Sequence, residues 1–163
     1  MNTLDKILFY IDGVLNIDRW ERHLLSQNLP LEDEYGICFD EDAIRNLSTI
    51  IEITNAKIVI HSTWKLGRPL TWMQSLWQKR ELPGQIYDIT PDIPPHYDKA
   101  IEIASWLEKH PLVKKYVILD DENIFSQYNI ASLIQIDSTI GITEKNAKEI
   151  IAKFQESSLQ RFQ

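Results

Sequence analysis

Short apolar runs along the chain predict buried β-strands. Each run is four or five residues long and is closed by polar residues or by a Pro- or Gly-containing turn. Runs of this length, apolar on both faces, are typical of strands in the interior of a parallel sheet. The predicted strands are residues 7–11, 57–61, 86–89, 116–119 and 132–136.

Between these runs, apolar residues recur every three to four positions, which predicts amphipathic helices. Asp40, Glu41 and Asp42 supply acidic residues for the first turn of one helix, and Thr143 can cap the last. We expect the inner faces of the four helices to be Ala43, Leu47, Ile50 and Ile51; Leu70, Met73, Leu76 and Trp77; Ile101, Ala104 and Leu107; and Ala147, Ile150, Ile151 and Phe154.

The alternation of strands and helices predicts an α/β fold, because β-α-β crossovers produce a mainly parallel sheet with helices on both faces. We expect one Rossmann-like domain over residues 1–163, built as a three-layer sandwich around a five-stranded sheet. Residues 16–39 and 91–97 are predicted to be the longest irregular stretches and to lie over a site. The insert before residue 57 is too short for a large cap domain with its own core.

Composition and charge restrict the kinds of partner that we expect the protein to bind. The 163-residue chain is 44% hydrophobic and carries a formal net charge of −7. An acidic surface repels nucleic-acid backbone, and the small basic groups at 79–80 and 114–115 do not form a continuous track. Without a secretion signal or a long apolar segment, and with Cys38 as a lone cysteine, the sequence favours a cytoplasmic location.

Polar residues follow several of the predicted strands. The carboxyl ends of parallel strands meet at one edge of a sheet, where ligands bind. Carboxylates there can hold Mg²⁺, a hydroxyl can donate to a phosphoryl oxygen, and a lysine at a helix start can neutralise developing charge. The candidate residues are Tyr10, Asp12, Ser62, Thr63, Lys99, Asp120 and Asp121.

Four motifs in order resemble those of the haloacid dehalogenase (HAD) superfamily. Residues 7–16, ILFYIDGVLN, resemble the first motif, which is usually Asp-x-Asp-Gly-Val. Residues 57–65, KIVIHSTWK, resemble the second, Lys99 fits the third, and residues 116–121, YVILDD, resemble the acidic fourth. Some further details are similar to a compact branch that includes the HAD domains of Swiss Army Knife RNA-repair proteins: Ser62 with Trp64, and residues 90–91, 106–107 and 141–143.

This resemblance implies an active-site plan. It places the nucleophile at position 10 and the general acid and base at Asp12, and it implies Mg²⁺ held by Asp12, Asp120 and Asp121. It also implies phosphate binding by Gly13, Ser62, Thr63 and Lys99.

Position 10 departs from that plan, because Tyr10 stands where the family has its nucleophilic aspartate. A phenol has an ordinary pKa near 10, so it stays protonated at neutral pH and offers no carboxylate to Mg²⁺. Three alternatives are open: loss of the usual catalysis, a tyrosyl-phosphate mechanism with Asp12 as base, or a natural chain with Asp at position 10, since the Asp and Tyr codons differ by one base.

We therefore predict a catalytically degenerate, phosphatase-like domain that acts by binding a small phosphorylated ligand or a protein partner. Mg²⁺ binding would be weakened by the loss of the carboxylate at position 10. The alternative is an active Mg²⁺-dependent phosphohydrolase acting on a nucleotide, a nucleic-acid end or a small phosphomonoester, with nucleic acid implied by the resemblance alone. A phosphorylation-receiver domain is disfavoured because the acidic pair 120–121 follows a late strand instead of the first.

His61 and the tryptophans have both structural and functional interpretations. His61 beside Ser62 can contact phosphate or serve as a hydrogen-bonded structural residue, and no second His or Cys at ligand spacing supports zinc. Trp72 and Trp77 follow helical periodicity, which favours packing over base stacking. Trp20, within a predicted loop, is the better candidate for a lid or a partner contact.

Overall fold

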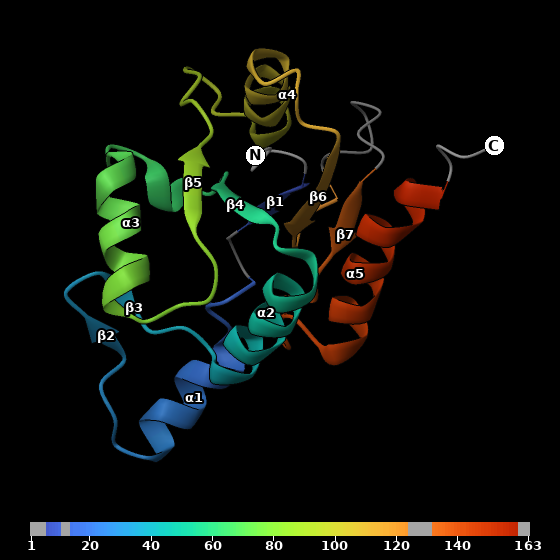
Figure 1. Ribbon diagram of the computed structural model, residues 1–163. Coiled ribbons are helices and arrows are strands. Elements are labelled where there is room, and N and C mark those ends of the chain that lie inside the picture. The colour runs from blue at the N-terminus through green and yellow to red at the C-terminus, as the bar shows by residue number, and fades with distance from the viewer. Residues whose placement is uncertain (1–5, 11–13, 124–131, 160–163) are drawn as a thin grey trace.

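The computed structural model describes residues 6–10, 14–123 and 132–159, with side chains for residues 14–123 and 132–156. Within these residues, five strands form one sheet in which every pair of neighbours is parallel, in the order β5-β4-β1-β6-β7 (Figure 1). They are β1 (Lys6–Tyr10), β4 (Lys57–Ile60), β5 (Ile86–Ile89), β6 (Lys115–Asp120) and β7 (Leu133–Gln135). The predicted α/β class is confirmed.

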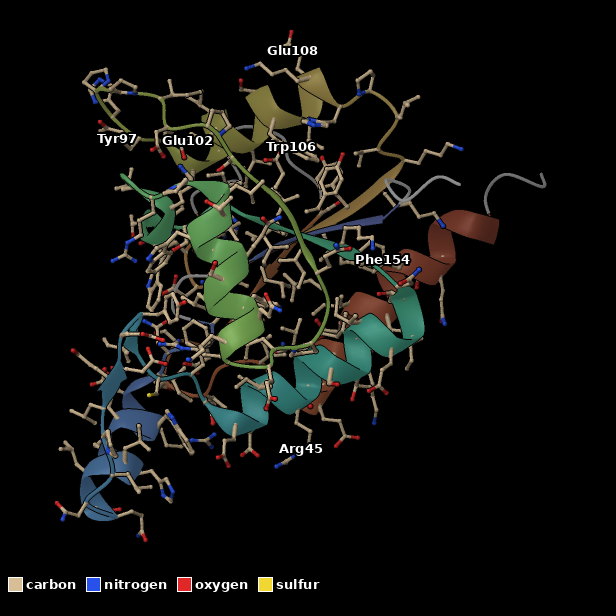
Figure 2. The ribbon with its side chains drawn as sticks, turned by 60° about the vertical axis from the view of Figure 1, so that its left-hand side comes forward. Arg45, Tyr97, Glu102, Trp106, Glu108 and Phe154 are labelled. Atoms are coloured by element: carbon tan, nitrogen blue, oxygen red, sulfur yellow. The ribbon has the colours of Figure 1, made fainter. Side chains whose placement is uncertain are left out.

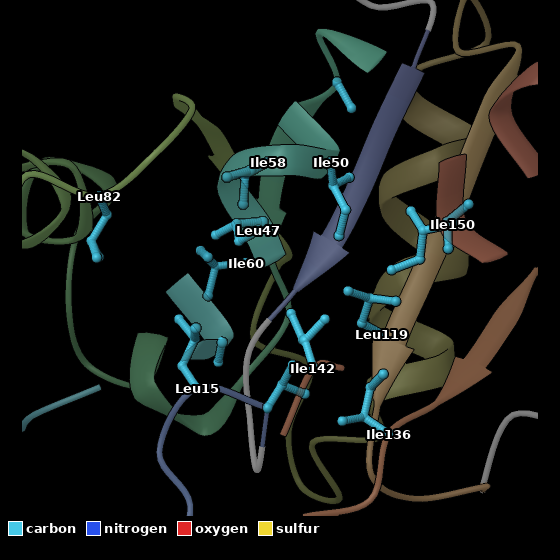
Figure 3. Close-up of a cluster of buried hydrophobic side chains, with 14 of the residues drawn as sticks. Leu15, Leu47, Ile50, Ile58, Ile60, Leu82, Leu119, Ile136, Ile142 and Ile150 are labelled. Atoms are coloured by element: carbon cyan, nitrogen blue, oxygen red, sulfur yellow. The ribbon is translucent and has the colours of Figure 1, made fainter. Parts of the chain in front are cut away.

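Helices cover both faces of the sheet because successive strand residues point to opposite sides. Ile58 and Ile60 of β4 belong to a core shared with α2 (Glu41–Thr54), α3 (Leu70–Lys79) and α5 (Glu144–Leu159), part of which Figure 3 shows. Val59, between them, packs into a second core with Ile118 and the buried residues of α4 (Lys99–Lys109). The sheet therefore lies between two helical layers.

Local capping starts the helices where the sequence indicates. The Asp40 carboxylate accepts a hydrogen bond from the Asp42 backbone N–H at 3.2 Å, and the Thr143 hydroxyl accepts one from the Asn146 N–H at 3.1 Å. The Asn46 amide donates to the Ile142 carbonyl at 2.7 Å and so joins α2 to the start of α5. The inner faces predicted for α2, α3 and α5 all contribute buried side chains.

The face predicted for α4 is wrong at Ile101 and Ala104, whereas Leu107 is partly buried against the core as predicted. Ile101 is 43% exposed and Ala104 also faces solvent, whereas Ala100, Ile103 and Trp106 are buried. Both sets have helical spacing, so periodicity alone does not choose between them. Tertiary contact decides, because the Trp106 indole N–H donates to the Asp88 carboxylate of β5 at 2.7 Å.

The prediction of an irregular stretch over residues 16–39 is also wrong. It contains the helix α1 (Asp18–Ser26) and an antiparallel hairpin of β2 (Glu32–Asp33) and β3 (Gly36–Ile37). Trp20, expected in a loop, lies on α1 and stacks on His23 with ring centroids 5.0 Å apart. None of the helices in the described part of the chain combines the length and the apolar character that crossing a bilayer requires.

The strand order reverses direction beside β1. The chain runs from β1 outward through β4 to β5, then returns through α4 to place β6 on the other side of β1. In open parallel sheets, this reversal leaves a crevice at the carboxyl ends of the two diverging strands. The carboxyl ends of β1, β4 and β6 are therefore the place to look for a site.

Candidate active site

Position 10 lies at the centre of this edge. Tyr10 ends β1 and pairs with Ile60 of β4, while the preceding residue, Phe9, pairs with Ile118 of β6. The backbone of residue 10 is thus flanked by the ends of both neighbouring strands. The Tyr10 side chain, Asp12 and Gly13 lie outside the described residues, so their predicted roles stay predictions.

Asp120, the last residue of β6, is the buried centre of the described site. Its side chain has no exposed surface, and its Oδ1 accepts a hydrogen bond from the Glu122 backbone N–H at 2.9 Å. Its own carbonyl accepts from the Ile136 N–H at 2.8 Å, which ties the end of β6 to the segment after β7. Both backbone and side chain of Asp120 are therefore held in place.

Lys99, the first residue of α4, faces this carboxylate. The Asp98 carboxylate caps α4 by accepting from the Ala100 and Ile101 N–H groups at 2.9 and 3.3 Å. Lys99 Nζ lies 3.2 Å from Oδ2 and 3.4 Å from Oδ1 of Asp120, and 3.7 Å from a Glu122 oxygen. With 14% of its side chain exposed, Lys99 can still reach a ligand at the sheet edge.

His61, directly after β4, is the second cation-capable partner of Asp120. Its Nε2 lies 2.9 Å from Asp120 Oδ2, and its side chain is fully buried. His61 and Asp120 stand two residues beyond Val59 and Ile118, which pack under α4, so alternation along the strands places them on the face that α4 covers. Between the two interpretations of His61, the geometry favours the hydrogen-bonded structural residue.

The two adjacent carboxyl groups have opposite pKa shifts. Burial opposes ionisation of Asp120, but the hydrogen bond and charge of His61, the Glu122 N–H and Lys99 together lower its pKa to about 2. Burial, and then the hydrogen bond and charge of Asp120, raise the pKa of the Asp121 carboxyl to about 6. At neutral pH the pair therefore repel each other, and Lys99 offsets part of that repulsion.

Ser62 and Thr63 follow His61 and begin the short helix η1 (Thr63–Lys65). The Ser62 hydroxyl is buried and accepts a hydrogen bond from the Trp64 N–H at 3.1 Å, which leaves its own hydrogen to donate. Thr63 is exposed at the start of the helix. The predicted phosphate-binding residues Ser62, Thr63 and Lys99 thus all lie at the carboxyl edge of the sheet.

A buried ion pair near the site was missed by the sequence interpretation. Lys65 lies 3.1 Å from Glu102 of α4, each with only 2% of its side chain exposed, and it also pairs with Asp92. Glu102 accepts from the Ile93 N–H at 3.0 Å, and Figure 2 shows it near the loop that carries Tyr97, whereas Glu108 points outward.

The ion pair Lys65–Glu102 joins η1 to α4. It therefore also links the segment that carries Ser62 to the helix that carries Lys99. No local signal in the sequence marks Glu102, because periodicity does not decide which face of α4 is buried.

The described residues do not form a Mg²⁺ site by themselves. No group of three or more His, Cys, Asp or Glu within them is arranged to hold a metal ion. Asp120 and Asp121 are adjacent, but both oxygens of Asp120 already accept from Lys99, His61 or the Glu122 N–H. The donors that the described part of the site can offer to a ligand are the Ser62 and Thr63 hydroxyls and Lys99, whose charge is shared with Asp120 and Glu122.

One family model matches the part of the chain that forms this edge of the sheet. The model of the family described as "HAD domain in Swiss Army Knife RNA repair proteins" matches residues 7–147. The matched range runs from β1 into the first turn of α5 and includes every strand end discussed above. A search of curated proteins found no match.

Proposed function

Because the chain belongs to the family of HAD domains in Swiss Army Knife RNA repair proteins, we propose that it is a phosphatase-fold protein that has lost phosphoryl transfer. It acts instead by binding a phosphorylated ligand. The observation that carries this proposal is the residue type at position 10, which lies between the ends of β4 and β6.

A nucleophile at this position needs a carboxylate or an activated equivalent. Tyrosine is neutral at physiological pH unless a base or a strong positive field lowers its pKa. The two cation-capable side chains described near this edge, Lys99 and His61, both contact Asp120. A phenol there neither attacks phosphorus readily nor contributes a charged oxygen to a metal ion.

Binding of a phosphoryl group is what the remaining residues support. Ser62 supplies a hydroxyl donor, Thr63 a second hydroxyl, and Lys99 a charge that can shift from Asp120 toward an incoming anion. Hydrogen bonds to charged groups contribute about 1.5–3 kcal/mol each, enough for a specific although modest phosphate site. Gly13, which precedes Val14, adds a backbone N–H if it follows the plan of the family.

A small phosphorylated ligand, or a phosphorylated group on a protein partner, fits this chain better than a long nucleic acid. The net charge of −7 disfavours an extended polyanion. The family description leaves a nucleic-acid end as the alternative ligand, since an end presents one terminal phosphate. The rival activity is Mg²⁺-dependent hydrolysis of such a phosphomonoester.

The deciding experiment compares the natural protein with Tyr10→Asp in a phosphomonoester hydrolysis assay, with and without Mg²⁺. We expect no turnover by the natural protein under either condition. We expect Mg²⁺-dependent turnover by Tyr10→Asp that disappears when Asp12→Asn is added. Robust Mg²⁺-dependent turnover by the natural protein would overturn the loss of catalysis.

Binding is tested separately by titrating inorganic phosphate into the natural protein, Lys99→Gln and Lys109→Gln. Lys109 is the exposed lysine at the end of the same helix, so its variant makes the same charge change away from the site. We expect Lys99→Gln to weaken phosphate binding about 10-fold or more, and Lys109→Gln to leave it unchanged. Equal phosphate affinity in both folded variants would contradict the proposed binding site.

A further inference from the structure

A cavity of about 330 Å³ opens beside the phosphate-binding edge. It lies between η1 and the β2–β3 hairpin, and we call it the aromatic cavity. The lining residues that matter here are Glu32, Tyr35, Gly36, Thr63, Trp64 and Arg68. Its volume is at the lower end of the range of small-molecule sites, which suits one ring system.

The aromatic walls of this cavity are fixed by their neighbours. The Trp64 indole packs against the Phe39 ring with centroids 5.4 Å apart, and the Tyr35 ring meets the Trp72 ring edge-on at the same distance. Rings held in this way lose little further freedom when a ligand stacks on them. The cavity is therefore pre-organised on both aromatic sides.

Arg80, which follows α3, fixes the hairpin wall. Its guanidinium donates to both oxygens of Asp33 at 2.8 and 2.7 Å and to the Gly36 carbonyl at 2.9 Å. Such a two-pronged pair sets orientation as well as distance. Gly36 in turn lies against Trp64, since a Cβ added there would be 3.6 Å from the indole Cη2. The hairpin is thus held against η1 at a set distance.

The cavity combines stacking surfaces with polar edges. Arg68 stacks over Trp72, with its Cζ 4.0 Å from the ring centroid and 5.9 Å from that of Trp64. The Arg68 guanidinium can donate hydrogen bonds to a ligand, and the Glu32 carboxylate can accept hydrogen bonds from one. The positive charge of Arg68 disfavours a free cation, and the negative charge of Glu32 disfavours a bare anion. Neither charge disfavours a neutral planar ring.

The cavity begins one residue from the proposed phosphate contact, because Thr63 lines it and Ser62 precedes Thr63. We propose that the aromatic cavity receives a planar aromatic ring joined to the phosphoryl group of the ligand, stacked on Trp64 and contacted at its edge by Arg68. This inference rests on the proposed phosphate binding for the placement of the phosphoryl group. It adds the chemical class of the rest of the ligand, whether a phenyl ring or a nucleobase.

The test is a titration of the natural protein with phenyl phosphate, adenosine monophosphate, glycerol 3-phosphate and inorganic phosphate. We expect at least one of the two ring-bearing phosphates to bind about 10-fold more tightly than glycerol 3-phosphate, as stacking on one aromatic side chain allows. Preference for adenosine monophosphate over phenyl phosphate would identify a nucleobase, and the reverse order a simple aryl ring. Equal affinity for all three organic phosphates would overturn the inference.

Two variants test whether the aromatic cavity causes the preference for a ring-bearing phosphate. Arg68→Ala changes an exposed residue and should remain folded, and Trp64→Leu removes the stacking surface. Both should lose the preference for a ring while keeping the affinity for inorganic phosphate. Arg45→Ala is the matched control, since Arg45 is an exposed arginine on α2 that does not line this cavity (Figure 2). A ring preference retained in Arg68→Ala and Trp64→Leu would contradict the assignment.

A final measurement distinguishes binding of the ring from binding of the phosphoryl group. The indole N–H signal of Trp64, identified by its loss in Trp64→Leu, is followed by NMR as adenosine or phenol is added without phosphate. We expect one of them to shift this signal at millimolar concentration. If inorganic phosphate does not bind but the signal shifts, the proposed phosphate site fails and the ring site stands. If phosphate binds and neither compound moves the signal, the ring inference fails alone.

Discussion

His61 Nε2 lies 2.9 Å from Oδ2 of Asp120, and neither side chain has any exposed surface. His61 follows β4 and Asp120 ends β6, so this hydrogen bond links the two strands that flank β1. It closes the carboxyl edge of the sheet next to position 10. The stability of that edge therefore depends on a buried polar pair as well as on apolar packing.

Removing His61 should destabilise the fold strongly. In His61→Ala, the buried Asp120 carboxylate loses its hydrogen bond to the imidazole and retains Lys99 as its charged partner. Losing a hydrogen bond to this buried charged group costs about 1.5–3 kcal/mol in the free energy of unfolding. Urea denaturation at pH 7 measures this loss. His23→Ala, at an exposed position on α1, should cost less than about 1 kcal/mol, and equal losses in the two variants would contradict the special role of His61.

The acidic pair predicts a pH dependence of stability with two opposite parts. The pKa of Asp120 in the folded state is about 2, below the ordinary 3.8, so its contribution is present above pH 4 and is lost as the pH falls toward 2. The pKa of Asp121 is about 6 in the folded state, above 3.8, so ionising it costs stability. That cost is relieved as the pH falls from 6 to 4.

The variant Asp121→Asn tests the stability cost of ionising Asp121 separately from the contribution of Asp120. At pH 7 the variant should melt about 2–4 °C above the natural protein, a gain of about 1 kcal/mol after screening by solvent. At pH 4 the two melting temperatures should coincide. The measurement is thermal unfolding from pH 3 to 8 in the presence of a chelator. Glu108→Gln, an exposed position on α4, is the control, and a uniform offset of Asp121→Asn at every pH would refute the assignment.

The buried pair Lys65–Glu102 should behave as a unit. Lys65→Met alone leaves a carboxylate with 2% exposure without its ammonium partner, at a cost of about 3–5 kcal/mol. Lys65→Met with Glu102→Leu should recover much of that loss, because both charges are then absent. A double-mutant cycle by urea denaturation should give a coupling energy of about 2–3 kcal/mol.

The exposed pair Lys79–Glu34 provides the matched cycle. Its atoms are 3.7 Å apart and its side chains are 69% and 63% exposed. Water screens such a pair, so its coupling energy should be below about 0.5 kcal/mol. Coupling of similar size in the two cycles would show that burial of Lys65 and Glu102 contributes nothing.

Gly36 should be required by the backbone of the hairpin. Its φ of +106° lies where residues with a Cβ are strained, so Gly36→Ala should cost about 1–3 kcal/mol. Gly67, with a φ of +67° and open space around it, lies close to the left-handed region that other residues tolerate. Gly67→Ala should therefore cost less. Urea denaturation of both variants checks this order, and a larger loss in Gly67→Ala would reverse the interpretation.

Strands and most helices could be predicted because their signals are local. A buried parallel strand must be apolar on both faces, and β4 and β6 show this in three and four consecutive apolar residues, respectively. The face of α4 could not be predicted because two apolar sets share the helical period. Contacts with other elements distinguish them: Ala100, Ile103 and Trp106 pack against Val59 and Ile118, and Trp106 also bonds to Asp88.

The hairpin was missed for a different physical reason. Its strands are two residues long, and their burial pattern is exposed or half-buried, so no alternation marks them. Arg80, distant in sequence, holds them through Asp33 and Gly36. At the candidate site, the positions of Ser62, Lys99, Asp120 and Asp121 could be predicted because each ends or follows a strand or begins a helix, while their roles stay predictions. The partners Lys65 and Glu102 could not, since their value depends on a contact across the fold.

The placement of β1 in the middle of the sheet has a consequence for biosynthesis. Lys6 pairs with Lys115, and Ile7 with Tyr116, so one side of β1 cannot pair with β6 until residues 115–120 have been translated. Until then it can hydrogen-bond only with β4 on its other side. An unpaired apolar strand of this kind invites association between nascent chains, which makes the synthesis of residues 57–120 the interval in which chaperones have most to protect.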